Sequence, residues 1–208
     1  EDIDSVYLDK VHTISIDPEV IKRQKDLSIV FTPIHGTGMM LVPRALKQWG
    51  FENVHCVEEQ MVKSGDFPTV ISPNPENAEA LSMAIELAKK INADIVMATD
   101  PDADRMGIAA KNKEGEYVLL TGNQTGAILL DYLAKYKKTE KQRVVYNTIV
   151  TSNLAMAICK RHNIELVQTL TGFKFIGEQA ALIEGTDKEF FFGYEESYGY
   201  VIKDFVRD

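Results

Sequence analysis

Three aspartates alternate along a short stretch near the middle of the chain: Asp100, Asp102 and Asp104. They follow a predicted strand at residues 94–98, and Arg105 comes directly after them. Three carboxylates this close repel one another unless a cation neutralises them, and alternate side chains of an extended segment can converge on one point. Such oxygen ligands suit Mg²⁺ or Ca²⁺, and arginine suits a phosphoryl group. The stretch therefore predicts a metal site beside a phosphate contact.

The same stretch has alternative interpretations. An EF-hand loop beginning at Asp100 would need glycine at its sixth position and glutamate at its twelfth, where the chain has Arg105 and Lys111, so this class is excluded. An aspartyl-phosphate phosphatase would use Asp100 as its nucleophile, which the spacing permits but which gives Asp104 and Arg105 no role. A solvated acidic turn without a ligand also remains open.

A turn with two glycines, His35-Gly36-Thr37-Gly38, follows one predicted strand and precedes a helix. A dinucleotide-binding fingerprint would need a third glycine where the chain has Leu41, so that function is excluded. The glycines are explained by tight-turn geometry, and His35 is expected to be a hydrogen-bonded loop residue.

Two further loops carry polar groups at the ends of predicted strands. The first, Thr171-Gly172-Phe173-Lys174, precedes a helix, where backbone N–H groups can meet anions and Lys174 would add a mobile positive charge. The second, Glu195-Glu196-Ser197, offers carboxylates and a hydroxyl that suit sugar hydroxyls. An ordinary charged loop is the alternative for each.

The elements that must position these loops alternate along the chain. Short apolar runs rich in β-branched residues are followed by segments whose apolar residues recur at helical spacing, which favours α/β sheets. A hairpin near residues 111–118 makes the first sheet mixed. We expect two consecutive domains, residues 1–118 and 119–208. The predicted strands are 28–33, 53–57, 94–98, 106–110, 117–120, 143–147, 164–168 and 190–193, and the predicted helices are 42–49, 75–88, 128–136, 153–161 and 176–183.

Composition excludes several classes of protein. The chain has 208 residues, of which 45% are hydrophobic and 26% charged, so it is not disordered. Its net charge of −8 argues against a nucleic-acid partner, and no apolar run reaches the ~18 residues of a membrane span. The acidic start does not fit a signal peptide, and Cys56 and Cys159 lack metal-ligand spacing. We therefore expect a cytoplasmic protein.

Five segments occur in a fixed order along the chain: Thr32–Gly38, Pro73–Glu76, Asp100–Gly107, Thr171–Lys174 and Gly193–Gly199. In this order they resemble the α-D-phosphohexomutase superfamily, the phosphoglucomutases and phosphomannomutases. The resemblance covers nearly the whole chain, and the aspartate loop together with the Glu-Glu-Ser loop is its most specific part.

The resemblance implies an architecture. The enzymes of this superfamily have four domains, and the chain is similar to the second and to most of the third, each a three-layer α/β/α domain with a mixed sheet. Domains I and IV of the same polypeptide are then the partners that this chain lacks. No Ser-His pair, which carries the phosphoserine of domain I, and no Arg-x-Ser-Gly-Thr phosphate loop of domain IV occurs in the sequence.

The resemblance also implies roles for individual residues. The aspartates would bind Mg²⁺ together with an oxygen of the phosphoserine, and Arg105 would hold the transferring phosphoryl group. The loops of the third domain would contact the substrate, with Lys174 as a candidate for proton transfer. The residues concerned are Asp100, Asp102 and Asp104 for the metal, Arg105 and Lys174 for catalysis, and Thr171, Gly172, Glu195 and Ser197 for the sugar. At Ala103 many relatives have glycine.

The implied reaction converts hexose 1-phosphate into hexose 6-phosphate by Mg²⁺-dependent phosphoryl transfer. A phosphoserine and a hexose 1,6-bisphosphate, which also activates the enzyme, would be its intermediates. The Glu-Glu-Ser-Tyr-Gly motif resembles that of the glucose and pentose branches of the superfamily. A phosphoglucomutase is therefore expected, with phosphomannomutase and phosphopentomutase as alternatives. The chain alone is expected to be inactive. A different class, a non-catalytic module that binds Mg²⁺ and a phosphosugar, remains open.

Overall fold

The computed structural model describes residues 2–203 and 205, which form two compact units divided between Leu120 and Thr121. The predicted boundary between residues 118 and 119 falls inside strand β5 (Tyr117–Leu119). The first unit continues to Leu120 because the N–H of this residue donates to the carbonyl of Ile108, 2.9 Å away. Thr121 then begins the second unit as the N-cap of a helix, in a capping box with Gln124.

The first unit contains a five-stranded mixed sheet, as predicted. Strand β1 (Ile29–Thr32) pairs in parallel with β2 (Val54–Cys56) and β3 (Ile95–Thr99), while β4 (Met106–Lys111) and β5 are antiparallel. The strand order is β2-β1-β3-β4-β5. All four residues of β1 are buried, which explains why this strand is a continuous apolar run in the sequence.

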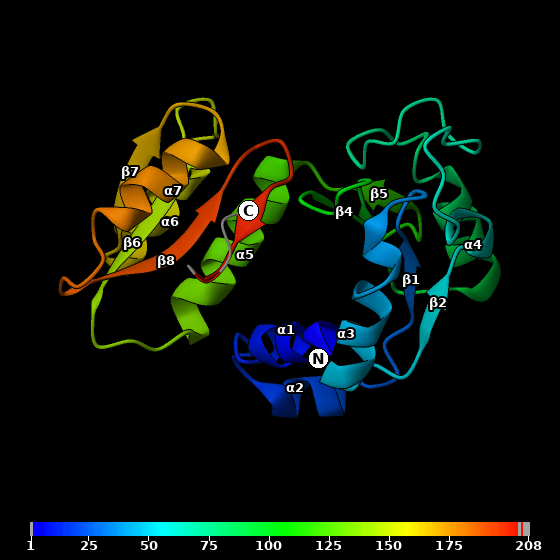
Figure 1. Ribbon diagram of the computed structural model, residues 1–208, viewed down its shortest axis with the longest axis horizontal. Helices are drawn as coiled ribbons and strands as arrows, with labels where there is room; N and C mark the ends of the chain where they lie inside the picture. Colours follow the sequence, from blue (N-terminus) through cyan, green and yellow to red (C-terminus); the bar gives the residue numbers. More distant parts are fainter. Residues whose placement is uncertain (1, 204, 206–208) are drawn as a thin grey trace. The chain divides into compact units, whose positions relative to one another are not determined.

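Helices cover both faces of this sheet. Helix α4 (Ser82–Ile91) packs Ala84 and Ala88, both fully buried, against β1 and β3. Figure 1 shows α3 (Val42–Trp49) on the opposite side of the sheet from α4. Gly50 ends α3 in a left-handed conformation with φ of 101°, as the sequence predicts for its C-terminus.

Two helices precede the first strand and have no counterpart among the predicted elements. Helix α1 (Ile3–His12) packs on α3, with an ion pair of 2.8 Å between Arg44 and Asp4. Helix α2 (Pro18–Arg23) is capped by Asp17, whose side chain accepts from two backbone N–H groups, and proline occupies its first turn. A capping aspartate followed by proline is a common start of a helix.

The helix predicted to start at Pro75 starts later, at Ser82, so this expectation is wrong. Asn74 caps only a turn: its side-chain oxygen accepts from the N–H of Glu76 at 2.9 Å. The carbonyl of Pro75 lies against β4, where a Cβ on Gly107 would be 2.7 Å from its oxygen. This close packing holds the turn and places Glu76 beside the aspartate loop. Two short 3-10 helices also occur in the unit, η1 (Thr37–Met39) and η2 (Glu58–Gln60).

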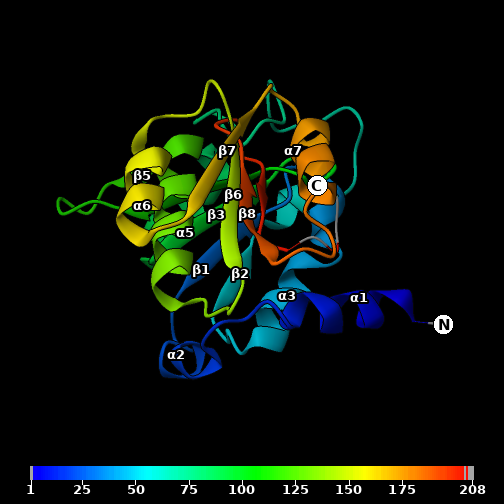
Figure 2. The same cartoon turned by 90° about the vertical axis from the view of Figure 1, so that its left-hand side faces the viewer.

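The second unit contains a four-stranded mixed sheet. The parallel strands are β6 (Gln142–Thr148), β7 (Glu165–Thr169) and β8 (Lys188–Tyr194), and the short antiparallel β9 (Tyr200–Val201), which was not predicted, completes the order β7-β6-β8-β9. Figure 2 shows α5 and α6 on one face of this sheet and α7 on the other. Their bounds are α5 (Gly122–Tyr136), α6 (Leu154–His162) and α7 (Phe173–Ala181). The predicted α/β class with mixed sheets is confirmed.

The buried face of helix α5 consists of small residues and two leucines, Leu130 and Leu133. A Cβ on Gly126 would be 2.2 Å from the ring of Tyr194, so only glycine lets the helix lie this close to β8. Three bulky residues of the predicted helical pattern, Ile128, Tyr132 and Tyr136, are instead exposed. The pattern predicted the helix correctly, but the buried face is decided by the aromatic ring beneath it.

None of the helices in the part of the chain that the structure describes has both the length and the apolar character needed to cross a membrane.

Candidate functional site

The aspartate loop connects two neighbouring antiparallel strands of the first unit. Strand β3 ends at Thr99 and β4 begins at Met106, and these two residues are paired across the sheet. The N–H of Ala103 donates to the carbonyl of Asp100 at 3.1 Å, which folds the loop back on itself. This turn brings one oxygen from each of Asp100, Asp102 and Asp104 within 4.8 Å of one another.

Arg105 is held by the carboxylate that begins the loop. Asp100 is only 1% exposed, and its two oxygens accept from the backbone N–H of Arg105 at 3.1 Å and from the guanidinium Nε at 2.7 Å. Glu76 lies 3.5 Å from the same guanidinium and Asp104 lies 3.8 Å away. Glu76 is not among the predicted site residues, although it belongs to the Pro73–Glu76 segment that carries part of the resemblance.

The loop is crowded with negative charge. Partial burial of Asp104, its hydrogen bond to Asp100 and the nearby carboxylates of Asp100 and Asp102 together raise the pKa of Asp104 to about 6, against the opposing effect of Arg105. A carboxyl group is perturbed in this way where like charges share one site. A divalent cation between the three groups would remove this repulsion.

The donor set fits a hard divalent cation. It offers three carboxylate oxygens, the ligand type that Mg²⁺ and Ca²⁺ prefer. Neighbouring ligands of an octahedral Mg²⁺ ion are about 3 Å apart and opposite ligands about 4.2 Å apart, so oxygens within 4.8 Å of one another can reach one ion after the exposed side chains move inward. Asp102 and Asp104 are exposed, which leaves room for further ligands.

Ala103 adopts a left-handed backbone conformation with φ of 65°. This region costs an alanine roughly 1–2 kcal/mol, whereas glycine enters it freely but loses about 0.5–1 kcal/mol through its greater freedom in the unfolded chain. Replacing Ala103 by glycine is therefore expected to raise the free energy of unfolding by up to about 1 kcal/mol. Urea denaturation of the two proteins measures the difference, and a less stable glycine variant would contradict the assignment of strain.

The loop after β1 packs directly on the aspartate loop. The N–H and the hydroxyl of Thr37 both donate to the carbonyl of Pro101, at 2.8 Å and 3.1 Å. A Cβ on Gly36 would be 2.4 Å from the Cα of Pro101, so only glycine permits this approach. Thr37 therefore acts as a clamp on Pro101, the residue between Asp100 and Asp102.

In the second unit, two loops meet at the carboxyl ends of the parallel strands. The N–H of Gly172, which follows β7, donates to a carboxylate oxygen of Glu195, which follows β8, at 2.6 Å. Gly172 has a φ of 113°, a conformation that favours glycine. The structure thus brings together two of the predicted substrate residues from segments far apart in the sequence.

The two neighbouring glutamates of the second loop have different partners. Glu196 accepts from the hydroxyl of Thr148 at 2.8 Å and lies 3.4 Å from that of Thr151, both on the segment at the end of β6. Glu195 therefore ties the loop to the segment after β7, and Glu196 ties it to the segment after β6. This division of roles was not visible in the sequence.

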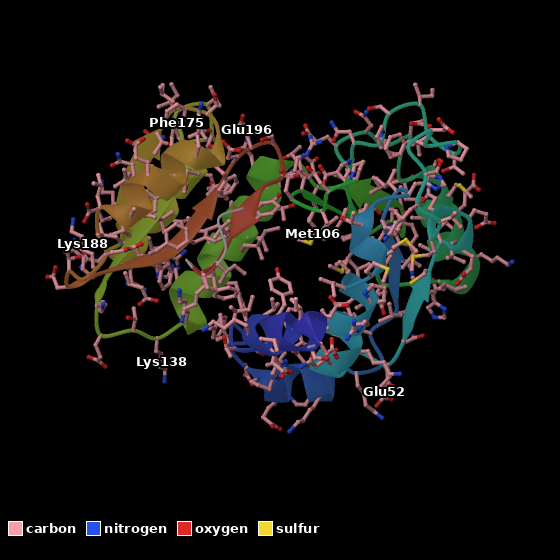
Figure 3. All side chains as sticks on the ribbon, in the orientation of Figure 1. Glu52, Met106, Lys138, Phe175, Lys188 and Glu196 are labelled. Carbon is pink, nitrogen blue, oxygen red and sulfur yellow. The ribbon has the colours of Figure 1, made fainter. Side chains whose placement is uncertain are left out.

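The remaining predicted residues of this unit lie at the same end of its sheet. Lys174 is exposed in the first turn of α7, with its Nζ 4.9 Å from the ring centroid of Phe175. Thr171 is exposed and Ser197 is half-buried. Figure 3 shows Phe175 and Glu196 at one end of this unit and Lys188, where β8 begins, at the other. In each unit the candidate residues thus gather at the carboxyl ends of parallel strands, the usual place for ligands in open α/β sheets.

Comparison with known families accounts for both units. A sequence profile described as "Phosphoglucomutase/phosphomannomutase, alpha/beta/alpha domain II" matches residues 5–115, and the profile for domain III matches residues 121–208. The chain belongs to the phosphoglucomutase/phosphomannomutase family. It comprises domains II and III of that family, which correspond to the two compact units.

Several curated phosphoglucomutases are close relatives within this family. One from Staphylococcus epidermidis is 41% identical over 185 residues, covering 89% of this chain and 34% of the relative. Another, from Staphylococcus aureus, is 40% identical, covering 89% of this chain and 33% of the relative. The chain therefore spans about a third of the length of these phosphoglucomutases.

Solved structures of the family share the fold. A phosphoglucomutase/phosphomannomutase family protein from Burkholderia thailandensis matches with a TM-score of 0.67 at 22% identity, over 86% of this chain and 36% of that one. The open form of parafusin, a phosphoglucomutase from Paramecium, matches with a TM-score of 0.70 at 20% identity, over 98% of this chain and 35% of that one.

Proposed function

We propose that the protein containing this chain is a phosphoglucomutase, which interconverts glucose 1-phosphate and glucose 6-phosphate by Mg²⁺-dependent phosphoryl transfer. The observation that carries the proposal is the cluster of Asp100, Asp102 and Asp104 around Arg105, in a chain 41% identical to a curated phosphoglucomutase. A divalent cation held by such carboxylates, together with a guanidinium, supplies the positive charge that stabilises a transferring phosphoryl group.

In this proposal the first unit handles the phosphoryl group. Asp100, Asp102 and Asp104 would hold Mg²⁺, which when bound supplies positive charge against the oxygens of the phosphoryl group. Arg105 orients that group through its guanidinium. The Nε of Arg105 is engaged by Asp100, and a third of the side-chain surface is exposed, so the outer nitrogens can reach a substrate.

The second unit would bind the sugar. Glu195 would accept hydrogen bonds from sugar hydroxyls, and Ser197 would donate to them or accept from them. These contacts would fix which end of the sugar faces the metal. A carboxylate has about four acceptor sites, so Glu195 can hold Gly172 and a sugar hydroxyl together. Thr171 and Gly172 would face the substrate beside Glu195. Lys174 is the candidate for moving a proton to or from the reacting hydroxyl.

The proposal requires groups that lie on other parts of the polypeptide. A phosphoserine on domain I would transfer its phosphoryl group to the free hydroxyl of the sugar phosphate, which gives glucose 1,6-bisphosphate. After this intermediate has turned around, the serine would take a phosphoryl group back from the other end of the sugar, and domain IV would bind the second phosphate. Glucose 1,6-bisphosphate would also activate the enzyme. We expect no nucleic-acid or membrane partner.

Other sugars and other reactions are the alternatives. A phosphomannomutase or phosphopentomutase would use the same aspartates and differ in how the Glu195-Glu196-Ser197 loop contacts the sugar. A phosphatase with Asp100 as its nucleophile is disfavoured, since Asp100 is 1% exposed and both of its oxygens accept hydrogen bonds from Arg105. A non-catalytic module that binds Mg²⁺ and a phosphosugar would have the same loops without turnover.

The test uses the full-length protein. We expect it to convert glucose 1-phosphate to glucose 6-phosphate with Mg²⁺ and a trace of glucose 1,6-bisphosphate, measured by coupling the product to glucose 6-phosphate dehydrogenase. Mannose 1-phosphate and ribose 1-phosphate are assayed in parallel by chromatography. A preference for either would change the sugar assigned, and release of inorganic phosphate without isomerised product would support the phosphatase instead.

The 208-residue chain alone is expected to give no product in the same assay, because it lacks a phosphoserine donor. Mixing it with catalytic amounts of the full-length enzyme provides the control for inhibitors in the preparation. Steady conversion by the purified chain would overturn the division of roles proposed above.

A further inference from the structure

A buried chain of hydrogen bonds surrounds His35 in the first unit. His35 is 3% exposed, and its Nδ1 lies 2.8 Å from the carbonyl oxygen of Val62 while its Nε2 lies 2.8 Å from the hydroxyl of Thr69. Gln60, fully buried, donates from its amide nitrogen to Thr69 at 2.9 Å and accepts from the hydroxyl of Thr32. The network joins β1 to the loop that follows β2.

The chemistry of these groups sets the direction of one bond of the ring. The carbonyl of Val62 can only accept, so the Nδ1 of His35 carries a proton and donates to it. The hydroxyl of Thr69 accepts from Gln60 and is the partner of Nε2. Both ring nitrogens thus have partners within the protein. This arrangement suits a ring that is held in place rather than a catalytic one.

The fixed ring sits on a strained backbone. Ile34 and His35 have φ values of 46° and 61°, so two successive residues other than glycine are left-handed. Such residues are strained and persist only where their surroundings hold them. The surroundings here are the buried Ile34 side chain, the ring of His35, and the His35 N–H, which donates to the carbonyl of Gln60 at 3.2 Å.

The strained turn places the next residues in contact with the aspartate loop. Directly after His35, Gly36 lies against the backbone of Pro101, and Thr37 donates twice to the carbonyl of Pro101. Pro101 separates the first two aspartates of the metal cluster. A change in the turn at residues 34–35 therefore moves the clamp on the peptide between Asp100 and Asp102.

We propose that His35 is a positioning residue for the aspartate loop, acting through the Thr37–Pro101 clamp. Its anchoring to Val62 and Thr69 keeps the left-handed turn in place, and the turn keeps the loop in the conformation that gathers its carboxylates. The consequence for metal binding rests on the proposed function. The consequence for the conformation of the loop does not.

The experiment measures the loop itself by amide hydrogen exchange in the 208-residue chain. His35→Ala removes both ring contacts, Thr69→Val removes one, and Thr69→Ser keeps the hydroxyl. We expect the amides of Thr37, Ala103 and Arg105 to exchange about tenfold faster in His35→Ala and several-fold faster in Thr69→Val, with wild-type rates in Thr69→Ser.

A matched control separates positioning from general loss of stability. Tyr117→Phe removes a hydroxyl that lies within hydrogen-bonding distance of the carbonyls of Ala88 and Ala93, in the same unit but away from the loop. It is expected to lower stability without changing exchange in the aspartate loop. Unchanged exchange at Ala103 and Arg105 in His35→Ala, or equal acceleration in Tyr117→Phe at matched stability, would overturn the proposal.

Titration of the same variants with Mn²⁺ tests the metal-dependent part. We expect about tenfold weaker binding in His35→Ala and wild-type affinity in Thr69→Ser. Absence of Mn²⁺ binding by the wild-type chain would count against the proposed metal site alone, since the exchange rates decide the positioning role independently. Full Mn²⁺ affinity in a His35→Ala variant with a loosened loop would overturn the link between the turn and the metal.

Discussion

Replacing Asp102 by asparagine in the full-length protein is expected to lower kcat for glucose 1-phosphate by about three orders of magnitude. The asparagine oxygen is neutral, so it attracts a divalent cation far less than a carboxylate does. A metal that stabilises a phosphoryl-transfer transition state contributes several kcal/mol, and each 1.4 kcal/mol is about tenfold in rate. Assays across a series of Mg²⁺ concentrations separate weaker metal binding from slower chemistry.

The same substitution is expected to leave the fold intact. Asp102 is exposed, and its removal relieves repulsion within the aspartate loop, so the metal-free variant should unfold at the same urea concentration as the wild type or a higher one. Asp26→Asn, an exposed aspartate that precedes β1 at the opposite end of the sheet, is the matched control and should keep full activity. Wild-type turnover in Asp102→Asn would refute the metal assignment.

Replacing Gly122 by alanine is expected to lower the free energy of unfolding of the second unit by about 2–3 kcal/mol. A Cβ at this position would be 1.9 Å from the carbonyl oxygen of Glu196 and 3.0 Å from the backbone nitrogen of Tyr198. Both atoms belong to the backbone of the loop at residues 195–199, so this loop itself must move. In the full-length enzyme we therefore also expect a higher KM for the sugar phosphate.

Gly177→Ala is the control for this substitution, because helix propensity predicts the same sign at both positions. Gly177 lies in the interior of α7 and nothing lies within 4 Å of the position of a Cβ. Alanine there should stabilise the protein by about 0.5–1 kcal/mol. Urea denaturation of the two variants should give shifts of opposite sign. A stabilised Gly122→Ala variant would show that the loop at residues 195–199 does not need to pack this closely on residue 122.

Local patterns in the sequence were sufficient to predict most elements of both units. The apolar run before Thr32 predicted β1, and the spacing from Val42 to Trp49 predicted α3, because the periods of strands and helices depend on neighbouring residues. The cluster of Asp100, Asp102, Asp104 and Arg105 was predictable for the same reason. Its members lie within six consecutive residues, so one turn of the chain brings them together.

The contacts between distant segments were decided by the tertiary structure. Glu76 reaches Arg105 only because the turn at Pro75 packs on β4 rather than starting a helix. Glu195 reaches Gly172 because β7 and β8 both run parallel to β6 in one sheet, which brings the loops that follow them to the same edge. No local period encodes either contact.

The role of His35 shows most clearly what the sequence determined and what only the tertiary structure decided. By itself the sequence determined a tight turn after β1 and a hydrogen-bonded histidine within it. Only the tertiary structure decided that Val62 and Thr69 are its partners and that the turn presses on Pro101. The physical reason is that a hydrogen bond depends on the positions of two groups in space, and those positions are fixed when the strands and loops of the whole unit pack together.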